Sequence, residues 1–390
     1  MEITVKAGGA RRGIIAVKKQ QNRSIEKLKQ ELSHKEDLEL LLLDDLYPAG
    51  GMAPGLEQLL VYETTGRLTP PGGLPADESC RVLELETLLN IHQAVVNERP
   101  VTRRLISCCG EVARPSVVRA HIGSSFREII ELCGGATCAE FVMISGGPIR
   151  GTVTTDLDTP VSKQTGAVIV LPPGHKLVQS KMLSLEFIIK RSKAVCLQCG
   201  LCTELCPIYL LGYELQPHKI MRQINYGLDS PPETIYNACL CIECGLCELY
   251  ACPLGLSPRR VNAALKQKLS EQGIKPGFEE MAPAGPGRHL QKLRNFRRVP
   301  TSRLIERLNL SSYARPLGLR ALETNPGQVE LLLKQGGGTG AVPVVKVGDI
   351  VQEGNLIADA PEARMGALHT GIAGRVVVVD KERVIVAGLG

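Results

Sequence analysis

The chain has 390 residues, 44% of them hydrophobic, which is enough material for several domains with separate cores. It has no Trp and only 3% aromatic residues, which argues against a nucleic-acid platform built by base stacking, and its formal net charge of +6 implies no partner by itself. No segment approaches the roughly 20 apolar residues of a membrane span, and the first residues lack the apolar block of a signal peptide. We therefore expect a soluble, cytoplasmic protein with no membrane span and no nucleic-acid partner.

Residues 1–99 alternate between strand and helix patterns, which is typical of a parallel α/β sheet covered by helices. Met1 leads almost at once into the turn at residues 6–13, so we expect a partial α/β domain whose first strand is missing. That turn is glycine-rich, but no strand precedes it, and it is not interpreted as a phosphate-binding loop. The expected elements are strands at 13–19 and 38–45, helices at 22–34 and 56–66, and a strand followed by a helix at 80–96.

Residues 100–180 predict a hairpin, one helix and return strands, which together resemble a small β-grasp module. The helix is expected within residues 124–135, where a Ser can cap its start and Gly-Gly can end it. Cysteines at 108, 109, 133 and 138 invite a metal site. Adjacent cysteines do not easily share one metal, however, and cysteines in strands are commonly small buried apolar residues, which is the interpretation we favour here.

Residues 181–273 carry the two motifs CLQCGLCTELCP and CIECGLCELYACP. Three cysteines at every third residue followed by a Cys-Pro are typical of two four-iron, four-sulfur clusters, in which the Cys before Pro ligates the other cluster. The pattern predicts one cluster on Cys196, Cys199, Cys202 and Cys252. It predicts the second on Cys206, Cys241, Cys244 and Cys247. Predicted helices between the motifs favour an α-helical ferredoxin-type domain.

Two alternatives to this interpretation are zinc sites and a disulfide framework. Neither commonly uses three cysteines per loop twice over with a trailing Cys-Pro, so we favour the clusters. The second motif has four residues before its last cysteine where the first has three. Cys239 is an alternative ligand that we interpret as a bystander thiol, and His218 is expected on the helix surface or beside the ligands.

The last two segments differ in character. Residues 274–328 are predicted to be a linker containing a basic helix, which we expect to be solvated or docked on an acidic partner rather than bound to nucleic acid. Residues 329–390 are rich in strands and resemble a barrel-sandwich hybrid, the fold of biotinyl and lipoyl carriers. Because the turn at 361–367 lacks the Lys that such carriers modify, a structural or docking role is expected.

Several further segments resemble the family of the cobalamin reductase of propanediol-utilisation microcompartments. The C subunit of the Rnf electron-transport complex shares this architecture, and the first part is similar to the 51-kDa flavoprotein subunit of respiratory complex I. The resemblance covers essentially the whole chain and is carried, besides the cysteine motifs, by LYPAGG (46–51), TGRLTPPGGLP (65–75), ETLLNIHQAV (86–95), PVTRR (100–104), SGGPIRG (145–151) and DTPVSKQTGAVIVLP (158–172).

The resemblance implies an oxidoreductase that passes electrons from NADH through FMN to two [4Fe-4S] clusters and then to cob(III)alamin or cob(II)alamin. It implies a corrinoid and a cobalamin adenosyltransferase as partners, and a location in a bacterial microcompartment, with contact to its shell. The chain departs from the family at three places: the glycine-rich phosphate loop is absent, Gly51 and Met52 follow the YPxG turn, and Leu83 and Glu84 replace paired Asn. The resemblance therefore does not decide whether this chain binds FMN. It also does not decide whether the chain is active without an upstream electron donor.

Two other functions fit the same sequence. An Rnf-type NADH:ferredoxin electron-transport subunit would use the same clusters with membrane partners. A docking or adaptor protein would use the clusters only as folding staples, because metal binding can supply folding free energy.

Overall fold

The computed structural model describes the chain except for residues 51–54, 228–231, 275–289, 319–320, 336–339, 361–365 and 390. The chain divides into two compact units, each made of two stretches of sequence. Unit 1 comprises Met1–Glu84 and Leu183–Ser311, and unit 2 comprises Leu85–Met182 and Ser312–Gly390. The N-terminal α/β segment and the cysteine motifs therefore share one unit, although about 100 residues separate them along the chain.

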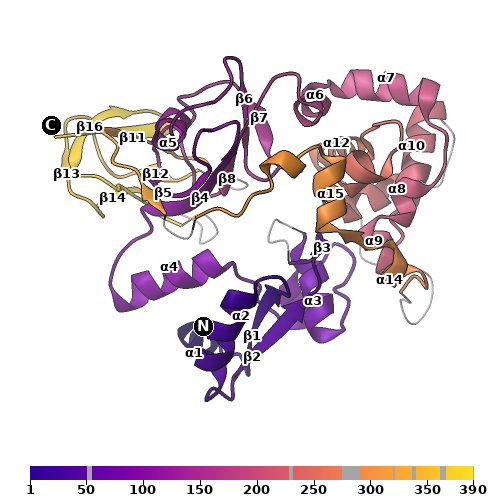
Figure 1. Ribbon diagram of the computed structural model, residues 1–390, viewed down its shortest axis with the longest axis horizontal. Helices are drawn as coiled ribbons and strands as arrows, with labels where there is room; N and C mark the ends of the chain where they lie inside the picture. The colour runs from indigo at the N-terminus through magenta and orange to yellow at the C-terminus, as the bar shows by residue number, and fades with distance from the viewer. Residues whose placement is uncertain are drawn as a thin grey trace. The chain divides into compact units, whose positions relative to one another are not determined.

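The N-terminal segment of unit 1 is built on a two-stranded parallel sheet, β1 (Gly13–Lys18) and β2 (Leu38–Leu43). The crossover between them is the amphipathic helix α2 (Asn22–Leu32), which Figure 1 shows beside the sheet and which buries Ile25. These elements confirm the predicted strands and helix. The residues before the turn form a helix, α1 (Glu2–Ala7), which the sequence patterns did not predict.

Two later parts of this segment differ in how well they were predicted. Helix α3 (Glu57–Thr65) ends, as predicted, at Gly66, whose φ of 69° is left-handed and therefore favours glycine. The strand predicted from residue 80 is wrong: residues 80–84 form no strand, and the next element is α4 (Leu85–Val96) in unit 2. The 3₁₀ turn Pro75–Glu78 precedes it.

The rest of unit 1 is helical and surrounds the cysteine loops. The helix that leads into the first motif is α7, and Ser184 caps its start, with its Oγ accepting from the backbone N of Phe187. The helices α8, α10, α12 and α15 gather in one part of the unit (Figure 1). Its elements are α7 (Leu185–Val195), α8 (Leu201–Glu204), α9 (Pro207–Leu210), α10 (Pro217–Tyr226), α11 (Pro232–Tyr236), η2 (Asn237–Leu240), η3 (Cys247–Ala251) and α12 (Pro258–Glu271).

The basic run after residue 290 is docked on acidic side chains of its own unit. Its elements are α14 (Arg294–Arg297), β9 (Val299–Pro300) and α15 (Thr301–Arg307), and β9 pairs with β3 (Leu46–Tyr47). Ion pairs join Arg294 and Arg298 to Glu63, Arg298 to Asp44, and Arg297 to Glu204 at 2.8 Å. The acidic partner expected for this helix is therefore supplied by the same chain.

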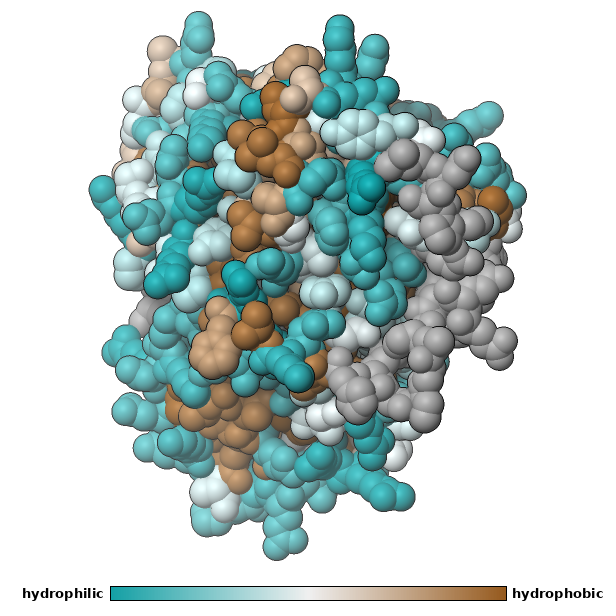
Figure 2. Space-filling model, turned by 90° about the vertical axis from the view of Figure 1, so that its right-hand side faces the viewer, coloured by the Kyte–Doolittle hydropathy of each residue, from teal (hydrophilic) through white to brown (hydrophobic). Residues whose placement is uncertain are grey.

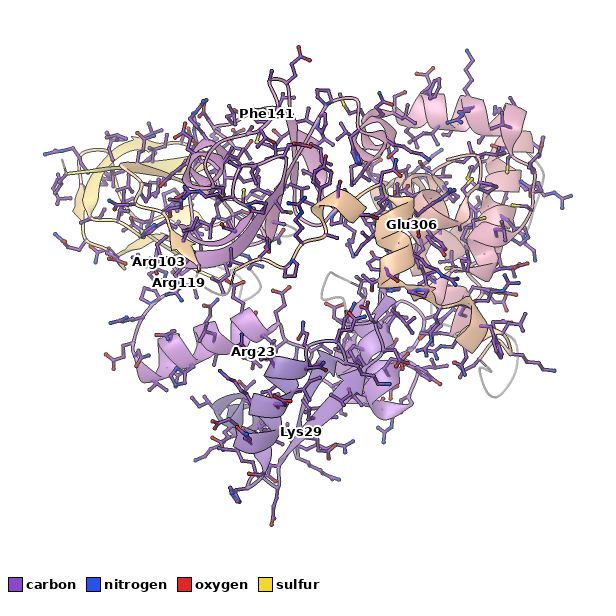
Figure 3. The ribbon with its side chains drawn as sticks, viewed as in Figure 1. Arg23, Lys29, Arg103, Arg119, Phe141 and Glu306 are labelled. Carbon is purple, nitrogen blue, oxygen red and sulfur yellow. The ribbon has the colours of Figure 1, made fainter. Side chains whose placement is uncertain are left out.

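Unit 2 contains a six-stranded mixed sheet in the order β10-β5-β4-β8-β6-β7. The predicted hairpin is confirmed as antiparallel β4 and β5, and the predicted helix as α5, whose N-cap Ser125 accepts from the backbone N of Glu128. Arg103 and Arg119, labelled in Figure 3, both pair with Glu323 of the edge strand β10. The elements are β4 (Arg103–Gly110), β5 (Ser116–His121), α5 (Phe126–Leu132), β6 (Val142–Ser145), β7 (Thr152–Thr154), β8 (Ala167–Leu171), α6 (Lys176–Met182), the 3₁₀ turn Ser311–Tyr313 and β10 (Leu322–Glu323).

The C-terminal part of unit 2 packs two antiparallel sheets around a core of buried Val, Leu and Ile. One sheet has the order β11-β17-β16-β13 and the other β12-β14-β15, as the predicted barrel-sandwich requires. The turn at 361–367, which lacks the carrier Lys, falls largely outside the described residues. The strands are β11 (Gln328–Leu332), β12 (Val342–Pro343), β13 (Ile350–Val351), β14 (Leu356–Asp359), β15 (Leu368–His369), β16 (Gly374–Val379) and β17 (Arg383–Gly388).

The surface and the helix lengths bear on membrane association. Figure 2 shows apolar side chains reaching the surface between polar ones on the face that it displays. In the part of the chain that the structure describes, no helix has both the length and the apolar character needed to cross a bilayer.

Candidate metal centres

The first cysteine loop curls around a cavity of about 430 Å³, a volume that includes space open to solvent. Helix α7 ends at Val195, and Gln198 and Gly200 take left-handed φ angles of 53° and 77° that turn the loop inward. The cavity is lined by four cysteines, Cys196, Cys199, Cys202 and Cys252. Three come from the first motif and one from the end of the second.

The second cysteine loop repeats this backbone. Glu243 and Gly245 take φ angles of 53° and 77°, matching the corresponding residues of the first loop. The second loop also curls around a pocket, which lies between this loop, helix α12 and the residues that follow the first motif. Its cysteines are Cys206, Cys241, Cys244 and Cys247, so the Cys-Pro of the first motif crosses to the second cavity.

The structure thus brings together the two sets of four cysteines that the spacing predicts, with the crossover of the Cys-Pro cysteines in both directions. Among the described residues, no three His, Cys, Asp or Glu side chains converge as ligands of a single ion would. A [4Fe-4S] cluster binds its four thiolates on four different irons, so its ligands surround the cluster instead of meeting at one point. Ligation by these eight cysteines stays a prediction.

Burial dominates the electrostatics of both cavities. It raises the pKa of Cys202 to about 12, with the nearby thiols of Cys252, Cys199 and Cys196 acting in the same direction. Burial also raises the pKa of Cys206 to about 12 and that of Cys247 well above its usual value. Thiols crowded in this way become thiolates when a cation binds among them, because the metal compensates their charge. The donor set therefore fits iron–sulfur clusters.

Helix α12 supports the second loop with cationic side chains. Arg259 Nε donates to Glu248 Oε1 at 2.6 Å, and the two side chains are only 17% and 5% exposed. About two turns further on, Lys266 Nζ donates to the carbonyl of Cys241 and to Glu243. Sequence reasoning did not single out these residues, although the amphipathic pattern of the helix and its cationic spacing of seven residues place both on one face.

Two residues considered as extra ligands have different positions. His218 lines the first cavity, its Nδ1 lies 2.7 Å from Thr203 Oγ1, and burial lowers its pKa. It therefore lies beside the predicted ligands, as one of its two expected roles requires. Cys239 does not belong to the lining of either described cavity. In unit 2, Cys108 and Cys133 are fully buried in the apolar core, which confirms their interpretation as core residues.

The N-terminal segment contacts the second cysteine loop directly. Tyr47 Oη donates to the carbonyl of Cys244 at 2.7 Å. A Cβ added at Gly55 would lie 3.0 Å from the side chain of Ile242, so the backbone approaches this loop closely. A second contact anchors the same segment, because Tyr213 Oη donates to the carbonyl of Thr69 at 2.6 Å. The second cysteine loop therefore packs against the α/β segment within one unit.

The turn at residues 8–12 does not suit a flavin phosphate. It follows the C-terminal end of α1, where backbone carbonyls and the negative end of the helix dipole are found, and it leads into β1. Phosphate loops instead lead from a strand into a helix N-terminus. The strand-to-helix turn between β1 and α2 has the sequence KQQ without glycine, and the connection from β3 to α3, which includes the departure at Met52, lies partly outside the described residues. The turns at residues 8–12 and 19–21 therefore do not fit the phosphate of FMN.

Four protein families match the chain in sequence order. The family described as Nuo51 FMN-binding domain matches residues 1–93, and the SLBB domain matches 106–152. The 4Fe-4S dicluster domain matches 195–257, and the RnfC barrel sandwich hybrid domain matches 317–388. These matches confirm the predicted fold class: a complex I 51-kDa-like α/β segment, an SLBB-like β-grasp module, a ferredoxin-type domain and a barrel-sandwich hybrid. They also show that residues 195–257 form a domain of the iron–sulfur dicluster type.

Curated relatives cover nearly the whole chain. "Cobalamin reductase PduS" of Citrobacter freundii is 38% identical over 99% of this chain and 83% of its own length, and the protein of the same name from Salmonella typhimurium gives the same values. The C subunit of the Na⁺-translocating ferredoxin:NAD⁺ oxidoreductase complex of Acetobacterium woodii is 30% identical over 54% of this chain and 44% of its own length.

One solved structure, an NAD⁺-reducing [NiFe]-hydrogenase in its air-oxidized state, aligns with 81% of this chain and 56% of its own. The TM-score is 0.39 at 17% identity.

Proposed function

The chain belongs to the cobalamin reductase family, and from this premise we propose that it is an oxidoreductase that carries single electrons through two [4Fe-4S] clusters to a corrinoid. The observation that carries the proposal is the pair of cavities, each lined by four cysteines with the Cys-Pro residues exchanged. Clusters bound there would supply one-electron transfer at a potential set by burial, charge and hydrogen bonds to sulfur. The acceptor is cob(III)alamin or cob(II)alamin, and the reduced corrinoid is the substrate of a cobalamin adenosyltransferase.

The surroundings of the two cavities suggest a direction for the electrons. The loop of the second cavity is contacted by Tyr47 of the N-terminal segment, and the cysteines of this cavity are buried. The first cavity has Cys199 exposed, and the neighbouring Leu197 is 70% exposed. We therefore assign electron entry to the second site and electron exit to the first, where an acceptor can approach the exposed loop. No step is assigned to flavin, because the turns at residues 8–12 and 19–21 do not fit its phosphate. NADH, or an upstream electron donor, supplies the electrons.

Anaerobic reconstitution with iron and sulfide tests the core of the proposal. We expect about eight irons per chain, four for each cluster, and EPR signals from two clusters after reduction with dithionite. The reduced protein should then convert cob(III)alamin to cob(II)alamin, followed by its visible spectrum. Fewer than about seven irons per chain would contradict the two-cluster assignment. Clusters that dithionite cannot reduce reversibly would favour the adaptor role, in which they act only as folding staples.

The proposed partners need a separate test. We expect the chain to bind an adenosyltransferase and to be enclosed in a diol-utilisation microcompartment, with contact to the shell. Co-purification with microcompartments from cells grown on a diol would support this location. Recovery in a membrane fraction together with an ion-translocating complex would instead support the Rnf-type alternative, to which the chain is similar over 54% of its length.

A further inference from the structure

Asn262 is a buried polar residue whose hydrogen-bonding capacity is not used by nitrogen or oxygen atoms in the described part of the chain. It lies in helix α12, and 1% of its surface is exposed. Neither its amide nitrogen nor its amide oxygen has a well-formed hydrogen bond among the described residues. An unsatisfied buried polar group costs about 1–3 kcal/mol, and most buried polar groups in native proteins have a partner. Asn262 therefore calls for a partner that the described residues do not supply.

The position of Asn262 indicates where that partner lies. Its side chain lines the second cavity together with Cys206, Cys241, Cys244 and Cys247. A cluster held by these four cysteines would fill the cavity that the Asn262 side chain lines, and its sulfur atoms can accept hydrogen bonds. Such a cluster is therefore the acceptor that lies within reach of the Asn262 amide.

The neighbours of Asn262 on the same helix face already have partners. Arg259, Asn262 and Lys266 are spaced at i, i+3 and i+7, which places them along one side of α12. Arg259 is paired with Glu248, and Lys266 donates to Cys241 and Glu243. Arg259 and Lys266 therefore stabilise the second cysteine loop. The amide hydrogens of Asn262 remain available to a group bound by the cysteines of this cavity.

The first cavity has donors of a different kind. Gln198 Nε2 donates to Cys196 Sγ at 3.2 Å, and the backbone N of Leu256 donates to Cys252 Sγ at 3.3 Å. Both donors are already engaged with cysteine sulfurs. At the second site, the side chain placed to donate an N–H to sulfur is Asn262, which belongs to helix α12 and lies outside the cysteine motif.

We propose that Asn262 is a positioning residue that donates an amide N–H to a sulfur atom of the second cluster and thereby raises the reduction potential of that cluster. The inference rests on the proposed function, because it requires a [4Fe-4S] cluster in this cavity. Reduction adds one electron and breaks no bond, so the reduced cluster carries one more negative charge. Burial opposes this charge, and an N–H donor stabilises it. Loss of the donor therefore disfavours the reduced state.

Redox titration of the reconstituted full-length chain, followed by EPR, tests the proposal with Asn262→Leu and Asn262→Asp. Leu has a similar size and no donor, and a carboxylate cannot donate and adds negative charge. For Asn262→Leu we expect about a tenfold fall in the equilibrium constant for reduction of one cluster, which is about 59 mV for one electron. We expect at least this shift for Asn262→Asp, and an unchanged potential for the other cluster. As a matched control, Gln198→Met removes the amide at the first site and should shift only the other cluster.

A second measurement distinguishes direct donation from a structural effect. After exchange into D₂O, pulsed EPR of the reduced wild-type chain should show a coupled exchangeable deuteron at the second cluster, and Asn262→Leu should lack it. Unmoved potentials, equal shifts of both clusters, an unchanged deuteron signal or loss of the second cluster from both variants would each overturn the proposal. Only about four irons in the wild-type chain would instead overturn the two-cluster assignment, and this inference with it. The failure of each is therefore recognised separately.

Discussion

The two cysteine cavities are built from the same loop but have different surroundings. Both loops use a pair of left-handed residues two positions apart, with matching φ angles, to turn three cysteines inward. The first loop leaves Cys199 exposed, whereas Cys206, Cys241, Cys244 and Cys247 of the second site are all buried. The comparison shows that the motif determines the local backbone, while helices and segments from elsewhere in the chain determine exposure, charge and hydrogen bonding. The predictions below test how far this difference extends.

The largest expected effect is the loss of one cluster at a time. Cys199→Ser should leave about four irons per chain, held at the second site, and Cys244→Ser should leave about four at the first. Because Cys244 lies in the buried site, its substitution should also lower the melting temperature more. Iron analysis and thermal unfolding measure both effects. If either variant lost all its iron, the two sites would not be independent.

The buried ion pair at the second site provides the next test. Arg259→Met removes the guanidinium that pairs with Glu248, whose side chain is 5% exposed, and removing one member of a buried pair typically costs about 3–5 kcal/mol. We expect a loss of this size in the free energy of unfolding by urea. Lys268→Met changes an exposed cation on the same helix and serves as the control, with little expected effect. Equal losses in both variants would show that the second site is not specially supported.

A smaller effect is expected where the basic segment docks on the N-terminal segment. Glu63 accepts ion pairs from Arg294 and Arg298, all three being partly buried. Glu63→Gln should destabilise the unit by about 1–2 kcal/mol, because two charge-assisted contacts in a partly screened site weaken together. Limited proteolysis should also release the N-terminal segment faster. The exposed Glu26→Gln is the control, and identical cleavage rates would show that these ion pairs do not hold the segment.

The smallest effect is expected at the contact between the N-terminal segment and the second loop. Tyr47→Phe removes the hydrogen bond to the carbonyl of Cys244, and the expected cost is about 1 kcal/mol. The variant should keep both clusters but receive electrons more slowly from a donor that docks on the N-terminal segment. Stopped-flow reduction measures this rate, with Tyr226→Phe, at a 54% exposed position, as the control. Faster or unchanged reduction would argue against electron entry at the second site.

Sequence reasoning was most accurate where the pattern is local. The hairpin at residues 103–121, the capped helix after Ser125 and the parallel pair β1 and β2 were predicted from periodicity and capping signals and are confirmed. It was wrong at residues 80–84, where an apolar alternation too short to pair with a sheet forms no strand. The helix at Glu2–Ala7 was not predicted, because a segment of six residues is too short to show a helical periodicity.

The sequence by itself determined which eight cysteines form two groups and how the groups exchange their last members, because that information lies in the spacing and in the chemistry of the cluster. Only the tertiary structure decided what surrounds each group. Arg259 and Tyr47 reach the second site from 11 and 197 residues away from their partners Glu248 and Cys244, and Asn262 reaches it from the next helix. Such contacts depend on how helices and segments pack against one another. No short sequence motif encodes that packing, so these contacts could not be predicted from the sequence.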